Sequence, residues 1–415
     1  MSKTAAQLFE EREKRVNDAV ALRAPDRVPI LLLTGFFPAY YAGITCEEAM
    51  YDGEKAMAAW SRFLLDFEPD MSDNPFATRV VGAVLEALGC THLKWAGHGL
   101  DANASYQFIE GQYMKPEEYD QFLFDPTDFI LRTYWPRIFS ALKPFEKLPA
   151  LHDIISYYMG IAKFAAFDTP DMRSAVAALL HAAEEAARIN AAARKWAQHS
   201  KDLGFPSQAG SFSQAPFDTI SDFLRGTQGA MTDMYRNPDK LLQALDKMLP
   251  IMLKLGATAK HRGAPRVFIP LHKGLDGFMS GAQFRKFFWP TLKKLIEGLI
   301  AEDCVPFVFW EGDVTSRLEI IGDIPKGKAV YGFERTDMFA AKRILGDTVC
   351  LKGAVPLSLM IAGTQQEVKD HCKKLIDVVG KDGGFIMDCS TVIDDAKPEN
   401  LRAMFEITRE YGVYR

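Results

Sequence analysis

The residues best suited to acid–base chemistry follow short apolar runs in the second half of the chain. His272 follows the run RVFIPL, and Glu311 follows VPFVFW. Glu334 ends the run AVYGFE, and Asp388 follows GGFIM. Carboxylates that share a partly apolar cavity raise one another's pKa, so one of them can donate a proton at neutral pH. We therefore predict that Glu311 and His272 are catalytic and that Glu334 and Asp388 contact the substrate.

The same part of the chain could hold a cation instead. His272, Glu311 and Cys389 have side chains of the types that bind metal ions. No HxC, CxxC or HExxH spacing selects a particular metal. Both interpretations, proton transfer and metal binding, therefore stay open at this point.

Three further polar residues lie close behind the two catalytic candidates. Asp276 follows His272 in the loop HKGLDG, and Asp313 and Arg317 follow Glu311. We predict that all three bind the substrate. The alternative is that Asp313 caps the next helix and that Arg317 pairs with it.

The first half of the chain adds a histidine and several aromatic residues. His98 lies between two glycines in GHGL, where the backbone can approach a ligand closely, so it is a third catalytic candidate. Phe36, Phe37 and Tyr40 follow the apolar run VPILLLTG, and Tyr106 lies in YQFIEGQYM. We predict that these aromatic residues bind a largely apolar substrate, and core packing is the alternative.

A third group of polar residues follows the run PSQAGSF. Asp218, Asp222 and Arg225 lie close together in SFSQAPFDTISDFLR. They could contact the substrate, or they could form a network of helix caps and ion pairs. The sequence does not decide between these interpretations.

Apolar runs alternate with amphipathic stretches along most of the chain, which is typical of parallel strands covered by helices. The predicted strands are 266–271, 305–312, 329–334, 348–355 and 383–390 in the second half, and 28–36, 92–97, 105–111 and 206–212 in the first. About eight such units favour an α/β fold of the (β/α)8 TIM-barrel type over an open sheet. Polar residues at the strand ends would then meet at the barrel mouth.

We predict a single domain over residues 1–415, although the length alone would also allow two or three domains. Residues 1–27 form an N-terminal helical extension, and residues 28–415 form the barrel with insertions around 106–204. Within that insertion, Thr169, Pro170 and Gly204 predict the ends of one long Ala-rich helix.

The composition narrows the class of protein. The net charge of −5 disfavours a nucleic-acid binder, which needs a basic face. Six scattered cysteines are too few for a disulfide scaffold. The charged start of the chain does not resemble a signal peptide, and no run is long enough to span a membrane. We expect a cytoplasmic enzyme with a small-molecule substrate and with neither a nucleic-acid nor a membrane partner.

Several longer stretches share a recognisable pattern. They are LRGTQGAMTDMYRNPDKL, GLDGFMSGAQFRKFFWPTLKKLI, LGDTVCLKGAVPLSLMIAGTQQEVKDHCKKLIDVVGKDGGFI and KPENLRAMFEITREYG. With them the chain from about Pro206 to its end resembles the uroporphyrinogen decarboxylase (URO-D) superfamily, and the N-terminal half resembles it more loosely. The resemblance implies a (β/α)8 barrel.

Departures from the family pattern indicate which branch is the better match. Uroporphyrinogen decarboxylases carry an arginine-rich motif after the first strand, whereas this chain has LLLTGFFPAYYAG there. The thiol-methylating members bind zinc through an HxC pair and a later cysteine. This chain has Phe309 and Glu311 at the HxC positions, so those zinc ligands are absent, although Cys389 lies near the position of the later cysteine.

The remaining resemblance is to the corrinoid-linked methyltransferase branch. It implies methyl transfer from a small O-methyl donor to a corrinoid carried by a separate protein, because this chain has no cobalamin-binding DxHxxG motif. Glu311, His272 or His98 would supply the proton, and a homodimer is left open. The alternatives are a decarboxylase of a small carboxylated substrate and a ligand-binding barrel without turnover.

Overall fold

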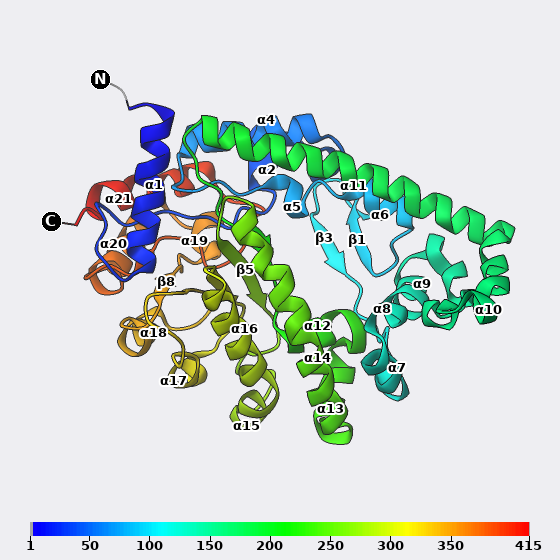
Figure 1. Cartoon of the computed structure of the whole chain (residues 1–415). Helices are drawn as coiled ribbons and strands as arrows, with labels where there is room; N and C mark the ends of the chain where they lie inside the picture. The colour runs from blue at the N-terminus through cyan, green and yellow to red at the C-terminus, as the bar shows by residue number, and fades with distance from the viewer. Residues whose placement is uncertain (1–2, 415) are drawn as a thin grey trace.

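The computed structural model describes residues 3–414, and its centre is a ring of short parallel strands (Figure 1). Six of them form one sheet in chain order. These strands are β4 (Ser211–Phe212), β5 (Arg266–Leu271), β6 (Val305–Trp310), β7 (Val330–Phe333), β8 (Cys350–Lys352) and β9 (Phe385–Ile386). All five neighbouring pairs are parallel.

Two extended segments near the N-terminus, and the stretch just before β4, close this sheet into a barrel. Residues 28–34 run beside β9, and residues 70–72 lie between them and the stretch that leads into β4. The closing contacts are the parallel Ile30–Met387 and Ser72–Ser207 bridges and the hydrogen bond from the Asp70 amide to the Ile30 carbonyl. With these two segments the ring has eight strands, which confirms the predicted (β/α)8 fold.

Two of the predicted strands were placed wrongly. Residues 92–97 and 105–111 do not enter the barrel but form a separate sheet of β1 (Leu93–Ala96), β2 (Gly99–Leu100) and β3 (Tyr106–Phe108). β3 is antiparallel to β1 and exposed along its whole length. A barrel strand is covered on both faces, which these polar and aromatic residues are not.

Helices cover the outside of the ring (Figure 1). Those that follow the strands are α12 (Pro216–Thr219), α13 (Gly226–Arg236), α14 (Pro238–Ala257), α15 (Gly281–Gln283), α16 (Trp289–Ala301), α17 (Leu318–Ile321), α18 (Met338–Leu345), α19 (Leu357–Ile361), α20 (Gln365–Val378) and α21 (Pro398–Tyr411). Between residues 34 and 72 lie α2 (Phe37–Ala42), α3 (Cys46–Tyr51) and α4 (Gly53–Phe67).

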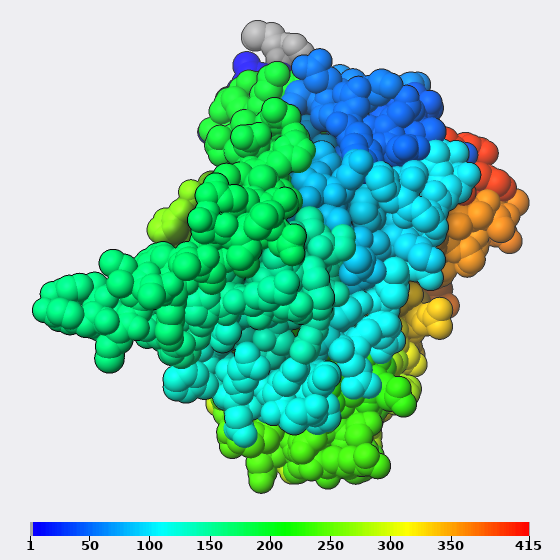
Figure 2. Space-filling model, turned by 90° about the vertical axis from the view of Figure 1, so that its right-hand side faces the viewer, coloured from blue at the N-terminus to red at the C-terminus, as the bar shows by residue number. Residues whose placement is uncertain are grey.

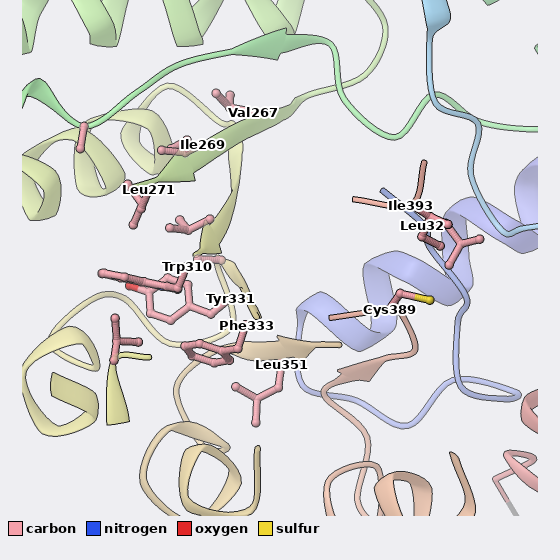
Figure 3. Packing of buried hydrophobic residues seen from close by; sticks show 14 of the residues in the cluster. Leu32, Val267, Ile269, Leu271, Trp310, Tyr331, Phe333, Leu351, Cys389 and Ile393 are labelled. Atoms are coloured by element: carbon pink, nitrogen blue, oxygen red, sulfur yellow. The ribbon is translucent and has the colours of Figure 1, made fainter. Parts of the chain in front are cut away.

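Successive strand residues alternate between this outer layer and the barrel interior. Figure 3 shows outward-facing residues such as Ile269, Leu271 and Trp310 packed in the layer between strands and helices. Their neighbours one position along the strand therefore face inward. At the strand ends this alternation directs His272 and Glu311 toward the barrel axis.

The N-terminal helix α1 (Ala5–Val20) closes the amino-terminal end of the barrel. Its Val16, Ala19 and Val20 pack against inward-facing residues at the beginning of the strands, including Phe307 and Val330. Because this end is plugged, the carboxyl-terminal end of the strands is the accessible mouth. Active sites of this fold lie at that end.

The chain leaves the barrel after Ser72 and returns near Pro206. This excursion, which starts earlier than residue 106, holds the β1–β3 sheet and the elements α5 (Pro75–Thr78), α6 (Gly82–Leu88), α7 (Tyr119–Phe124), α8 (Pro126–Phe129), α9 (Trp135–Ile138), α10 (Tyr157–Gly160) and α11 (Pro170–Asp202). The predicted long helix is confirmed as α11, whose N-cap Thr169 accepts a hydrogen bond from the Met172 amide. α11 extends well past the barrel (Figure 1). Within residues 3–414 no helix is both long enough and apolar enough to cross a bilayer.

Candidate active site

His272 is the centre of the polar cluster at the barrel mouth. It follows the last residue of β5, and its Nδ1 lies 2.5 Å from Oδ2 of Asp222. Its Nε2 lies 3.5 Å from Oε1 of Glu311, which follows β6. The structure therefore brings together two of the three predicted catalytic residues. One nitrogen of the imidazole is fixed by a carboxylate, and the other faces a second carboxylate.

The electrostatics of the cluster favour a charged imidazole. Partial burial alone would lower the pKa of His272, but the hydrogen bonds to Asp222 and Glu311 outweigh it and raise the pKa to about 11. The nearby charge of Asp218 acts in the same direction. At neutral pH His272 is thus an imidazolium with a proton available on Nε2.

Asp218 holds the loop that carries His272. Its carboxylate accepts the backbone N–H groups of His272 and Lys273, at 2.9 and 3.0 Å. Burial raises the pKa of Asp218 to about 7, and the neighbouring charge of Asp222 adds to that rise. Asp218 lies on α12, and Asp222 on the wide π-helical turn Ile220–Arg225 that follows it.

Asp218 and Asp222 were left undecided by the sequence, and the structure gives both a place in the cluster. Asp222 also accepts a hydrogen bond from the Gln214 amide at 2.8 Å and lies 3.4 Å from the Lys273 ammonium. Gln214 was missed entirely. Its only signal is its position two residues after the strand-forming run that ends in Gly210-Ser211-Phe212. The undecided Arg225, by contrast, is buried in an ion pair with Asp233, at 2.5 Å.

Glu334 and Tyr106 lie close to this cluster. Glu334 accepts the backbone N–H of Gly312 at 2.6 Å, so it supports the loop after Glu311. Tyr106, half-exposed on β3 of the inserted sheet, lies close enough to Glu311 for that charge to affect its phenol group. Burial raises its pKa against the effect of Arg79, and the charges of Asp394 and Glu311 add to the rise.

Three cations around the mouth, within the described residues 3–414, have acidic partners nearby. Arg79 lies 3.0 Å from Asp73, and Lys273 is paired with Asp222. The Arg335 guanidinium lies 3.8 Å from Glu334. A substrate with several carboxylates would need unpaired cations here. The described mouth is suited instead to a substrate with little charge.

Asp276, Asp313 and Arg317 have structural contacts of their own. Asp276 accepts hydrogen bonds from the Ser316 amide and hydroxyl, and Asp313 accepts from the Thr315 amide, so both hold the start of the turn after β6. Arg317 is almost fully buried and donates to the carbonyls of Leu275 and Met279. Asp313 thus contacts the backbone two residues later, and Arg317 pairs with Asp276 rather than with Asp313.

The aromatic residues after the first strand are not placed alike. Phe36 and Phe37 are buried, and Phe37 packs edge-on against Phe63 and Phe67 of α4. Both belong to the main hydrophobic core, which agrees with the packing alternative. Tyr40 is more than half exposed.

His98 contacts a different set of residues. It stacks on Trp95 with 4.6 Å between ring centroids, lies near the Tyr51 ring, and has its Nε2 3.8 Å from Glu86. These contacts hold it in the turn between β1 and β2. They do not bring it to His272 or Glu311.

Asp388 faces the barrel interior, where it forms a buried ion pair with Lys352 of β8. Burial raises the pKa of Asp388 to about 6, although the charge of Lys352 opposes the rise. Lys352 was not predicted, because one lysine in a short apolar run gives no sign of which face it occupies. Cys389, one residue later, lies in the outer core layer near Cys372 of α20.

The donor atoms present do not fit zinc. A zinc site needs at least three protein ligands around one point. His272 and Glu311 approach each other, but burial raises the pKa of the Cys389 thiol well above its usual value, and Phe309 occupies the first HxC position. Among residues 3–414 no group of three or more His, Cys, Asp or Glu side chains is arranged to hold a metal ion.

Comparisons with known proteins agree with this architecture. The model of the uroporphyrinogen decarboxylase (URO-D) family matches residues 170–411. Two proteins named uroporphyrinogen decarboxylase are similar, one from Chlorobium luteolum (24% identical over 182 residues) and one from Pseudomonas fluorescens Pf-5 (25% over 243 residues). The matches cover 43% and 51% of this chain, and 51% and 64% of the length of these relatives.

A solved structure, described as a methyltransferase from Methanosarcina mazei, is similar over almost the whole length. It has a TM-score of 0.62 and 15% sequence identity, and the match covers 99% of both chains. At this identity the similarity extends to the fold alone. It includes the N-terminal half, where the sequence pattern was weak.

Proposed function

The chain belongs to the uroporphyrinogen decarboxylase family, and from that premise we propose that it transfers a methyl group from a small O-methyl donor to a corrinoid carried by a separate protein. The observation that carries the proposal is the His272 imidazolium, held at Nδ1 by Asp222 and turned at Nε2 toward the mouth. The name of the structural neighbour supports the same class of reaction.

The proposed step transfers one methyl group to the corrinoid and one proton to the leaving oxygen. The bond between oxygen and the methyl carbon breaks and leaves its electron pair on oxygen, which takes the proton from Nε2 of His272. When bound, the corrinoid supplies the electron pair that accepts the methyl group. Asp222 orients the imidazole. After each turnover His272 takes a new proton from solvent water, because Asp222 and Glu311 keep its pKa high.

The pKa of His272 is well matched to one class of donor. At about 11 it lies close to the value of about 10 that a phenol oxygen has in water. A proton shared between two groups of similar basicity lowers the cost of expelling the oxygen. Phe309, two residues before Glu311 on the same face of β6, supplies an apolar floor for an aryl ring. We therefore propose aryl methyl ethers as donors.

The rival within the family is decarboxylation of a small carboxylated substrate. It is favoured by the names of the curated relatives, all of which are uroporphyrinogen decarboxylases. His272 could protonate the carbanion that loss of carbon dioxide leaves. Uroporphyrinogen itself, a tetrapyrrole with several carboxylates, fits poorly, because Arg79, Lys273 and Arg335 at the described mouth are paired with carboxylates of the chain.

One experiment separates these reactions. The purified protein is incubated with a reduced corrinoid protein and a panel of aryl methyl ethers, and the free phenol is measured. We expect phenol from the wild type, at least a 100-fold loss in His272→Gln and Glu311→Gln, and little change in Asp276→Asn. Carbon dioxide released from small carboxylates without corrinoid would replace the proposal by decarboxylation. Ligand binding with neither product would make the protein a binding barrel without turnover.

A further inference from the structure

The far end of the excursion carries an exposed apolar surface. Its six large side chains, here called the tip patch, are Ile155, Tyr157, Tyr158, Met159, Ile161 and Phe164, each between 56% and 87% exposed. Three of them lie on α10, two lie on the 3-10 turn that follows it, and Ile155 lies just before α10. In Figure 2 the teal-green segment around residues 150–175 projects from the rest of the surface.

The tip patch is larger than a folded monomer normally exposes. Aromatic side chains cover about 150–250 Å² each, so six large residues at these exposures present on the order of 900 Å². The largest apolar patch of a typical monomer is about 300–600 Å², whereas a stable interface buries about 800 Å² per partner. The patch is therefore of the size of one half of a protein–protein interface.

The charges around the patch are balanced within the chain. Lys163 lies 2.8 Å from Asp153, Lys143 lies 2.6 Å from Glu146, and Arg173 pairs with Asp168. A surface for anionic lipid, or for an oppositely charged protein, would carry unpaired cations. A balanced surface can instead meet an identical surface without like-charge repulsion.

We propose that the tip patch joins two copies of this chain in an isologous dimer. Homodimer interfaces are richer in apolar and aromatic residues than other interfaces, and Tyr, Met and Ile dominate here. In a two-fold arrangement the patch meets itself, which requires the charge balance described above. α10 lies at the end of α11 that is remote from the barrel (Figure 1), so this pairing leaves the proposed chemistry of the mouth untouched.

The test measures the oligomeric state of the full-length chain. Sedimentation velocity between about 1 and 100 µM follows the concentration dependence of dimer formation. We expect a dimer for the wild type and a dimer Kd raised roughly 100-fold or more in Ile155→Asp and Tyr158→Glu, because each change occurs twice in the interface. Tyr235→Glu on α13, which is 76% exposed, is the matched control and should remain dimeric.

Amide hydrogen exchange, measured at low and at high protein concentration, tests independently which surface is buried in the dimer. We expect amides of residues 151–168 to become protected as the concentration rises, with no second protected surface. A wild type that is monomeric at the highest concentration would overturn the proposal, as would tip variants that dimerise like the control. Protection at the patch together with a distant surface would indicate a head-to-tail contact instead. A monomer that sediments with phosphatidylcholine vesicles would identify the patch as membrane-binding.

Discussion

The hydrogen bond between Asp222 and His272 leads to a prediction about the pKa of His272 that can be tested without a substrate. Asp222→Asn keeps the shape of the side chain but removes the charge that faces Nδ1 at 2.5 Å. A hydrogen bond to a charged group contributes about 1.5–3 kcal/mol, and one pKa unit corresponds to about 1.36 kcal/mol. We therefore expect the pKa of His272 to fall by about 1–2 units, since Glu311 remains 3.5 Å from Nε2.

The same shift has a consequence for stability. The folded pKa of His272, about 11, lies above its ordinary value of 6.5, so protonation of this group stabilises the folded state. That contribution is complete below about pH 6.5 and is lost as the pH rises through about 11. In Asp222→Asn the folded pKa of His272 is lower, so the stabilisation by its protonation is lost completely at a lower pH. The wild type should therefore lose its extra stability over the variant between about pH 9 and 11.

The assay is an NMR titration of the imidazole groups. The chain has eight histidines, and the resonance that is missing from His272→Gln identifies the one of interest. Asp276→Asn is the control, because Asp276 lies in the same loop but bonds to Ser316. A His272 that titrates near 6.5 in the wild type, or one that Asp222→Asn leaves unmoved, would refute the electrostatic reasoning.

Four further variants test other parts of the fold by urea unfolding. Lys352→Met leaves Asp388 buried without its partner and should cost about 3–5 kcal/mol, whereas the double variant Lys352→Met, Asp388→Leu should be closer to the wild type. Arg317→Gln should cost about 2–3 kcal/mol, because it removes a buried charged donor from the Leu275 carbonyl, while the pKa of His272 stays unchanged. Thr169→Ala should cost about 1 kcal/mol, because it removes the N-cap of α11.

The barrel could be predicted because most of its strands are buried on both faces. A strand such as 266–271 or 305–310 must be apolar at nearly every position, so it stands out from the helices around it. The strand at 70–72 has no such signal. It is only three residues long, and its buried Asp70 is paired with Arg15 and Arg27, which lie far away in the sequence.

The strands of the inserted sheet were predicted as strands, but their place in the barrel was wrong. Leu93–Ala96 and Tyr106–Phe108 contain the aromatic residues typical of strands, and strands they are. Their partners are each other, and nothing in a short aromatic run states whether its neighbours are parallel or antiparallel. Pairing depends on long-range contacts. The estimate of about eight strands therefore agreed with the structure, although two of the predicted runs lie outside the barrel and the strand at 70–72 was not among them.

The residues of the candidate site also differ in how far they could be predicted from the sequence. His272 and Glu311 follow regular strands, so their direction could be inferred from alternation, and the structure brings them within 3.5 Å. Asp222 lies on a π-helical turn, where the extra residue per turn changes which side chain faces the strand ends. The spacing of Asp218 and Asp222 in the sequence does not indicate a π-helical turn. The residue that orients the imidazole therefore could not be singled out from sequence.

The alternation of side chains along a strand also explains why Cys389 lies near the position of the family's zinc-binding cysteine but does not face the barrel mouth. Asp388 and Cys389 are adjacent, and only one of them can face the barrel interior. Asp388 does so, paired with Lys352, while Cys389 packs toward α20 and the outer helices. A thiolate ligand at the mouth requires the cysteine on the inward face, one residue away. The inward carboxylate therefore fits the proton transfer that we propose for His272 better than a thiolate–metal site.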